Sequence, residues 1–259
     1  MNNITPDLRE AQLKELEIFL QFKKICDENG LKYYLTGGTL IGAVRHRGFI
    51  PWDDDMDILM PRKDYDEFAR LQESVLPEGY YYQSSELDGS YPNYFAKLRK
   101  GYADAAEQEQ EFIDIFPLDI CPYNDIAALL YFKLMAVINY AIADRLLDNF
   151  VCGYTRFYMR LLWGFLRRLP TPFLFRLRRW LRFVVDHLAS GARVCNIAGR
   201  YGFPGEMCLT EWFAVPATLE FEGYDCSVPS GWHELLTHMY GDYMTPPAED
   251  DRHGHFFNP

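Results

Sequence analysis

Residues 35–61, LTGGTLIGAVRHRGFIPWDDDMDILMP, constrain the fold more than any other stretch of this chain. Two adjacent glycines, Gly37 and Gly38, separate a short apolar run from a helix-like run that begins at Thr39. Glycines at such a turn let backbone N–H groups approach a ligand, and the start of a helix adds partial positive charge. The pattern predicts a strand, a phosphate-binding turn and a helix. A tight turn without a ligand is the alternative.

Four aspartates follow this turn closely: Asp53, Asp54, Asp55 and Asp57. If residues 55–60 form a strand, Asp55 and Asp57 project from one face, about 7 Å apart. Two carboxylates so placed can share hard cations, and without a cation they repel each other. We therefore predict Asp55 and Asp57 as metal ligands and leave the roles of Asp53 and Asp54 open. A solvated acidic loop is the other interpretation.

A third carboxylate is expected from residues 111–116, EFIDIF, which read as a strand. Asp114 lies in the middle of this apolar run, where an aspartate is costly to bury unless it is paired or bound to metal. Asp119, in Pro117-Leu118-Asp119, is the rival candidate, or it caps a turn.

Two basic residues lie on one predicted strand face. Residues 94–100 alternate so that Lys97 and Arg99 share a face opposite Tyr94, Ala96 and Leu98. Such a pair is either solvated or placed to neutralise a phosphate group.

Residues 127–190 differ from the rest of the chain in charge. They contain ten Lys or Arg and three Asp or Glu, a net charge of +7, while the remainder carries −18 and the whole chain −11. Helices are predicted near 127–149, 154–168 and 172–189. Two roles are open, a helical subdomain packed on the core or an amphipathic surface that contacts an anionic membrane.

Charge and cysteine usage exclude some classes of protein. A net charge of −11 argues against nucleic-acid binding, which needs a basic surface. The six cysteines form no Cys-x-x-Cys pair, which favours reduced thiols in a cytosolic protein. The first ten residues, MNNITPDLRE, lack the features of a signal peptide. We expect a cytoplasmic protein that can lie peripherally at the inner face of the membrane.

Three blocks of the sequence, residues 37–65, 113–119 and 221–247, resemble the LicD family, which includes bacterial phosphocholine transferases and fukutin-related proteins. The resemblance implies an α+β, nucleotidyltransferase-like fold with a mixed sheet core, flanking helices and an inserted helical subdomain. The Gly-Gly element of such folds matches Gly37-Gly38-Thr39. Their Asp-x-Asp pair matches Asp55 and Asp57, and their third acidic residue matches Asp114. The implied domains are a catalytic core (1–126), a helical subdomain (127–190) and an irregular region that completes the core (191–259).

The resemblance also implies a reaction. Mg²⁺ or Mn²⁺ held by Asp55, Asp57 and Asp114 would assist transfer of a phospho-linked group from a CDP-activated donor, such as CDP-choline, to a glycan hydroxyl. The acceptor would belong to lipopolysaccharide, capsule or teichoic acid, or to a lipid-linked precursor.

Donor contacts are predicted from residue chemistry, with the Gly-Gly-Thr element also matched by the resemblance. The candidates for binding the phosphates are Gly37, Gly38, Thr39, Arg45, Lys97 and Arg99. Trp52 is the candidate for a cation–π contact with a quaternary ammonium group. Two alternatives remain: the same chemistry with CDP-ribitol, CDP-glycerol or a sugar phosphate, and a non-catalytic module that binds glycan or lipid.

Overall fold

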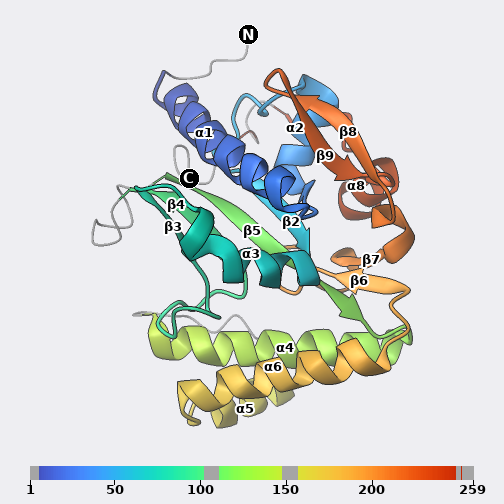
Figure 1. Cartoon of the computed structure of the whole chain (residues 1–259). Coiled ribbons are helices and arrows are strands. Elements are labelled where there is room, and N and C mark those ends of the chain that lie inside the picture. The colour runs from blue at the N-terminus through green and yellow to red at the C-terminus, as the bar shows by residue number, and fades with distance from the viewer. Residues whose placement is uncertain (1–5, 102–110, 148–156, 249–251, 253–259) are drawn as a thin grey trace. The chain divides into compact units, whose positions relative to one another are not determined.

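The computed structural model describes residues 6–101, 111–147, 157–248 and 252 (Figure 1). The helices are α1 (Pro6–Asn29), α2 (Gly37–His46), α3 (Arg62–Val75), α4 (Asp125–Leu146), α5 (Phe157–Leu166), α6 (Thr171–Leu188), α7 (Gly202–Gly205) and α8 (Trp232–Tyr240), with a 3-10 helix at Thr210–Phe213. The strands are β1 (Tyr34–Leu35), β2 (Asp57–Pro61), β3 (Tyr80–Gln83), β4 (Ala96–Lys100), β5 (Glu111–Cys121), β6 (Arg193–Cys195), β7 (Met207–Leu209), β8 (Pro216–Phe221) and β9 (Tyr224–Pro229). Helices thus accompany a mixed sheet, and the predicted α+β class is confirmed.

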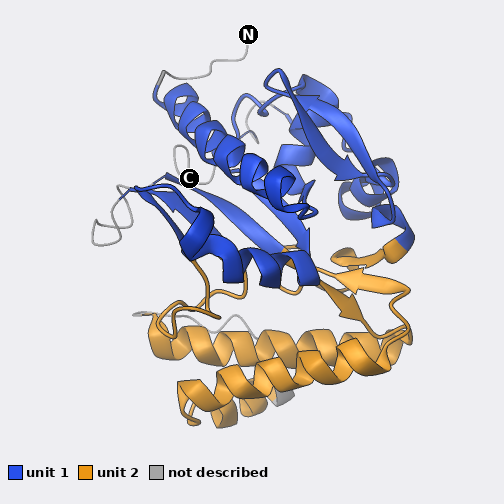
Figure 2. Cartoon of the chain, viewed as in Figure 1, with its two compact units in different colours: residues 1–82, 97–116, 211–259 blue, residues 83–96, 117–210 orange. Residues whose placement is uncertain are grey.

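The chain divides into two compact units, each discontinuous in sequence (Figure 2). Unit 1 comprises residues 1–82, 97–116 and 211–259, and unit 2 comprises residues 83–96 and 117–210. The helices α4, α5 and α6 all belong to unit 2. The predicted division at residues 126 and 190 stays a prediction.

The sheet of unit 1 has the strand order β1-β2-β5-β4-β3. Strand β2 is buried along Ile58, Leu59 and Met60, as expected of an interior strand, and pairs antiparallel with β1. Helix α1 has an apolar stripe that includes the fully buried Phe19 and Phe22. This sheet positions the acidic run, because Asp57 is the first residue of β2.

Strand β5 continues to Cys121, beyond its predicted end at Phe116. In unit 2 its last residues pair antiparallel with β6, where Asp119 lies opposite Cys195, and β6 pairs with β7. The partner strand lies more than seventy residues later in the sequence. Local periodicity carries no signal for such a pairing.

The prediction of an irregular region over residues 191–259 is wrong for much of its length. The region contains β6, β7, α8 and a hairpin of β8 and β9. The hairpin turns at Glu222 and Gly223, which both have positive φ, +52° and +83°. A glutamate is unusual there. Contacts distant in sequence hold it, because Glu222 N–H donates to Arg47 O at 2.9 Å and its carboxylate is paired with Arg9.

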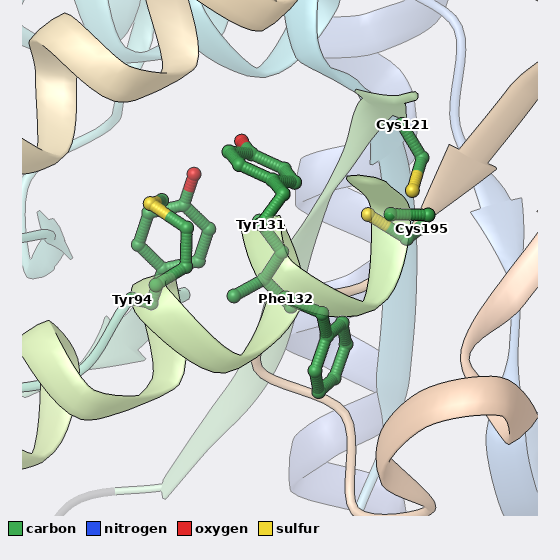
Figure 3. Packing of buried hydrophobic residues seen from close by; sticks show 8 residues of the cluster. Tyr94, Cys121, Tyr131, Phe132 and Cys195 are labelled. Carbon is green, nitrogen blue, oxygen red and sulfur yellow. The ribbon is translucent and has the colours of Figure 1, made fainter. Parts of the chain in front are cut away.

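The core of unit 2 forms around α4. One apolar cluster contains Tyr94, Cys121, Tyr131, Phe132 and Cys195, and Figure 3 shows the two cysteine side chains near each other. Another gathers buried residues of α4, α5 and α6. Within the described ranges, α4 alone has the length and hydropathy of a membrane-crossing helix, and 44% of its most apolar window is buried.

Candidate active site

The Gly-Gly turn opens helix α2 at Gly37, where φ is +57°. The residue before it, Thr36, is extended and its side chain makes no capping hydrogen bond. The first N–H groups of any helix lack acceptors within that helix, so this turn presents donors to an anion. The predicted strand-turn-helix arrangement is present in unit 1.

Both glycines lie against aspartate side chains. A Cβ placed on Gly37 would lie 2.7 Å from Asp57 Oδ2, and a Cβ on Gly38 would lie 2.5 Å from Asp53 Oδ2. Any larger residue at these positions would displace a carboxylate. The glycines therefore have a second role that the sequence did not reveal, which is to make room for the acidic run.

Thr39 connects α2 to the start of β2. Its Oγ1 accepts a hydrogen bond from Asp57 N–H at 2.9 Å, and Thr36 N–H donates to Asp57 O at 3.2 Å. Thr39 is buried, so these contacts exclude solvent. Thr39, predicted as a donor-binding residue, thus positions Asp57 in this structure.

Four aspartates lie near one another in unit 1: Asp53, Asp55, Asp57 and Asp114, here called the carboxylate cluster. Burial, and then the negative charges of Asp55, Asp114 and Asp53, raise the pKa of Asp57 well above its usual value. Burial and the charges of Asp55 and Asp54 do the same to the pKa of Asp53, which also shares a hydrogen bond with Asp55. The predicted strand from Asp55 begins at Asp57 instead, yet the two carboxylates still interact.

Asp114 joins this cluster from β5. Its N–H donates to Met56 O at 2.9 Å, which aligns β5 with the residues just before β2. Burial raises the pKa of Asp114, and the neighbouring Lys97 ammonium opposes that shift. The structure therefore brings together the three residues predicted as metal ligands.

The chemistry of the carboxylate cluster fits a hard divalent cation, since carboxylate oxygens are the ligands that Mg²⁺ prefers. Aspartates that raise one another's pKa by repulsion are stabilised when a cation neutralises them. Among the residues that the structure describes, no three His, Cys, Asp or Glu side chains already converge as a complete metal site. The carboxylate cluster therefore has the negative charge and the oxygen atoms to bind a divalent cation, although its described side chains are not already arranged as a complete set of ligands.

Lys97 and Arg99 flank this cluster from β4. Lys97 Nζ lies 2.8 Å from Asp114 Oδ1 and 3.3 Å from the centroid of the Phe112 ring, and Arg99 lies 5.0 Å from that centroid. The two basic side chains thus share a strand face, as predicted. Arg99 is only 3% exposed, so the solvated alternative is wrong for this residue.

Arg45 and Trp52 contact each other at the other side of the turn. Arg45 lies 5.9 Å from the centroid of a Trp52 ring, and its Nη1 donates to Tyr243 O at 2.9 Å. The guanidinium of Arg252 lies 4.8 Å from the Trp52 ring. A choline ammonium group would therefore compete with two arginines for this indole.

Asp54 and Asp119 are the most buried of the predicted aspartates. Asp54 is 2% exposed. Asp119 is fully buried in unit 2, where its Oδ2 accepts a hydrogen bond from Tyr94 OH at 2.8 Å. This bond gives Asp119 a structural role and favours Asp114 as the third carboxylate.

Helix α1 supplies two polar residues that the sequence analysis missed. Gln12 Nε2 donates to Asp53 O at 2.8 Å, and Glu15 is buried with no hydrogen-bond partner for its Oε2 among the described residues. Burial, and then the charges of Asp55 and Asp53, raise the pKa of Glu15 well above its usual value. Both residues interrupt the apolar stripe formed by Leu8, Leu16 and Phe19, which marks them as unusual but does not identify their partners.

Comparisons with known proteins cover the residues of this region. Residues 30–127 match the family model described as the nucleotidyltransferase domain of LicD, FKTN and FKRP. The lipopolysaccharide cholinephosphotransferase LicD of Haemophilus influenzae is 31% identical over 264 residues, covering 96% of this chain and 95% of that protein. The chain belongs to the LicD family. The resemblance predicted from residues 37–65 is confirmed, as is the assignment of a transferase of the LicD type.

Shorter matches extend to other proteins. The human and mouse ribitol 5-phosphate transferase FKRP are each 38% identical over 48 residues, which is 18% of this chain and 10% of theirs. An uncharacterised protein of Rickettsia typhi, RT0683, is 36% identical over 75 residues, covering 28% of this chain and 24% of that protein. These shorter matches support the family alone.

Proposed function

We propose that this LicD-family chain transfers phosphocholine from CDP-choline to a hydroxyl group of a cell-surface glycan or of its precursor. The observation that carries this proposal is the match along nearly the whole length of a cholinephosphotransferase. The carboxylate cluster beside the start of α2 supports it, because phosphoryl transfer needs both negative ligands for a cation and donors for phosphate.

The proposed reaction exchanges one phosphorus–oxygen bond for another. The acceptor oxygen forms a bond to the phosphorus that carries choline, and the bond from that phosphorus to the bridging oxygen of the pyrophosphate breaks. CMP leaves with the bridging oxygen and its electron pair. The hydroxyl proton passes to the carboxylate cluster, where Asp114 is our candidate to accept it.

The chain's own residues divide the remaining tasks. Asp55, Asp57 and Asp114 would hold Mg²⁺ or Mn²⁺, which when bound supplies positive charge to the pyrophosphate and to the leaving CMP. The N–H groups of Gly37 and Gly38 would donate to a donor phosphate. Lys97 and Arg99 would add charge from the side of β4.

The test is CMP release by the purified full-length chain with CDP-choline, Mg²⁺ and a methyl hexoside as the acceptor. We expect release that requires the cation and that Asp57→Ala abolishes. Asp225→Ala is the matched control, because Asp225 is an exposed aspartate on β9. Equal release by the Asp57→Ala variant and the wild type would contradict the proposed site.

The second candidate donor is CDP-ribitol. The match to ribitol 5-phosphate transferase FKRP favours it, although that match spans only 48 residues. A panel of CDP-choline, CDP-ribitol and CDP-glycerol separates the cargoes, because each would release CMP by the same chemistry. If CMP is released faster from CDP-ribitol than from CDP-choline, ribitol phosphate replaces phosphocholine as the proposed transferred group, and the proposed site stays the same.

A non-catalytic role predicts that the carboxylate cluster binds no divalent cation. Titration calorimetry with Mg²⁺ or Mn²⁺ tests it without any substrate. We expect binding that is lost in Asp57→Ala and kept in Asp225→Ala.

A cytoplasmic location is part of the proposal, because CDP-activated donors are made there.

A further inference from the structure

Helix α6 has two apolar faces instead of one. Its inner face contributes the buried Leu174 and Phe175 to the cluster shared with α4 and α5. Its outer face exposes Phe173, Trp180 and Phe183, at 43%, 58% and 57% of their surface. These three aromatic residues recur at intervals of seven and three along the helix, so they share one stripe.

Arginines interleave with the exposed aromatic residues. Arg176 and Arg179 are exposed on this outer face. Arg178 instead points inward, where its guanidinium donates to Ser85 Oγ at 2.5 Å and to Asn139 Oδ1 at 3.2 Å. The helix therefore satisfies its one buried arginine within unit 2 and leaves the outer arginines facing solvent. The outer α6 face is defined here as Phe173, Arg176, Arg179, Trp180 and Phe183.

Helix α5 repeats the pattern. Phe157, Leu161 and Phe165 are exposed at intervals of four residues, and Arg160 lies beside them. Of the large apolar side chains that are exposed in the described parts of the chain, more than half lie between residues 123 and 188. A concentration of this kind marks an interaction surface, because scattered exposed apolar residues are the usual state.

The same segment is strongly basic. Residues 157–188 contain seven arginines and one aspartate, a net charge of +6. The whole chain has a net charge of −11, so the remaining residues together carry −17. Arg178 points inward and Arg167 pairs with Asp144, so the exposed side owes its charge mainly to Arg160, Arg168, Arg176 and Arg179. Two copies joined symmetrically through this face would bring these like charges together. A flat anionic surface matches both its charge and its apolar side chains.

We propose that the outer α6 face, together with the exposed side of α5, docks on the surface of an anionic lipid bilayer. Aromatic rings sit favourably at the level of the lipid head groups, and arginines pair with lipid phosphates. The 18 residues of α6 would lie in the plane of the surface for about 27 Å. This inference does not depend on the proposed function.

Docking of this kind is oriented. The rest of the chain, at −17, is repelled by an anionic surface, whereas the basic segment is attracted to it. The basic segment therefore favours approach of the outer α6 face to the lipid over approach of the acidic remainder of the chain.

Vesicle co-sedimentation tests the proposal. We expect the full chain to sediment with vesicles of 70% phosphatidylcholine and 30% phosphatidylglycerol at low salt, and not with pure phosphatidylcholine. The double variant Arg176→Gln, Arg179→Gln should lower the partition coefficient about thirtyfold, since each arginine near an anionic surface contributes roughly a fivefold factor. The matched control Lys32→Gln, Lys63→Gln removes two exposed charges from unit 1 and should bind normally.

A second measurement separates insertion of the aromatic rings from simple attraction of charge. Brominated lipids should quench tryptophan fluorescence in the wild type, and Trp180→Phe should lose most of that quenching while remaining folded. Absence of binding to the anionic vesicles overturns the proposal. A dimer that Trp180→Ser dissociates, seen by light scattering without vesicle binding, would overturn it in favour of self-association.

Discussion

Lys97 Nζ lies 2.8 Å from Asp114 Oδ1, and this ion pair links β4 to the carboxylate cluster. Both side chains are largely buried, with 13% and 16% of their surface exposed. The ammonium group partly balances a set of four aspartates that otherwise repel one another. Asp114 thus contacts the Lys97 ammonium group and also lies near Asp55 and Asp57, the other two proposed metal ligands.

The first prediction concerns Asp114 as the third carboxylate. Asp114→Asn should lower the rate of CMP release about as much as Asp57→Asn, by a hundredfold or more, roughly the loss seen when a charge-stabilising group is removed from an active site. Both variants should also weaken binding of Mg²⁺ in calorimetry. The variants keep the side-chain shape, so circular dichroism should match that of the wild type.

Asp119→Asn serves as the contrasting variant. Its loss of charge weakens the buried hydrogen bond from Tyr94 OH, so we expect lower thermal stability. The rate of the folded enzyme should be nearly unchanged. A large loss of rate in Asp119→Asn with a normal rate in Asp114→Asn would reverse our assignment.

The second prediction concerns Gly38. Its φ is not positive, so alanine adds no backbone strain, but the new methyl group would lie 2.5 Å from Asp53 Oδ2. Gly38→Ala should therefore displace the Asp53 carboxylate and lower activity by up to a hundredfold, the order expected for misplacing a reacting group by about 1 Å. Gly89→Ala is the control, because in the described parts of the chain no atom beyond its sequence neighbours lies within 4 Å of the added Cβ. Steady-state kinetics of the two variants make the comparison, and wild-type activity in Gly38→Ala would contradict it.

The local features of the site could be read from the sequence. The Gly-Gly turn, the alternation that places Lys97 and Arg99 on one face, and the aspartate inside an apolar strand all follow from spacing of a few residues. Each of these predictions depends on neighbours along the chain. Helices α4, α5 and α6 were likewise predicted to within a few residues over the part of the chain that is described, because helical patterning is local, whereas α8 was not predicted.

The remaining features depend on contacts between distant segments. Arg45 donates to Tyr243 O, almost two hundred residues later, a contact that spacing does not reveal, and its predicted phosphate binding stays a prediction. The turn at Glu222 lacks the usual Asn-Gly or Asp-Gly signal because Arg9 and Arg47 hold it instead. The role of Glu15 was missed because the carboxylates that raise its pKa lie about forty residues away in the sequence. A polar residue within an apolar stripe carries no information about such distant neighbours.

The third prediction concerns Glu15, the buried carboxyl group of α1. At pH 8 the Glu15→Gln variant should melt at a higher temperature than the wild type without divalent cations. Burial and the neighbouring aspartates raise the pKa of Glu15, so the carboxylate that is ionised in the unfolded state at pH 8 is disfavoured in the folded state. The variant should also gain less thermal stability on addition of Mg²⁺, since the carboxylate cluster then carries less negative charge. Thermal melts with and without Mg²⁺ measure both effects.

Glu10→Gln provides the control on the same helix. Glu10 is 69% exposed and pairs with Lys14, so its replacement should change neither melting temperature appreciably. If Glu15→Gln instead gains as much from Mg²⁺ as the wild type, Glu15 takes no part in cation binding.

The fourth prediction concerns Glu206, a buried carboxyl group in unit 2. Burial raises the pKa of Glu206 from 4.5 to about 7, although Tyr201 N–H donates to its Oε1 at 2.9 Å. The folded state therefore binds this proton more tightly than the unfolded state does. The resulting stabilisation is fully present below pH 4.5 and is lost as the pH rises through about 7.

Glu206→Gln removes this titration and isolates its effect from that of the carboxylate cluster. The free energy of unfolding of the variant should be close to that of the wild type at pH 5 and should exceed it increasingly up to pH 8. A rise of the pKa from 4.5 to about 7 corresponds to a difference of about 3 kcal/mol in the free energy of unfolding at pH 8. Urea unfolding at pH 5, 6, 7 and 8 measures the difference, with the exposed Glu211→Gln as the control. A difference that stays constant over this range would mean that Glu206 titrates with an ordinary pKa and that water reaches its carboxyl group.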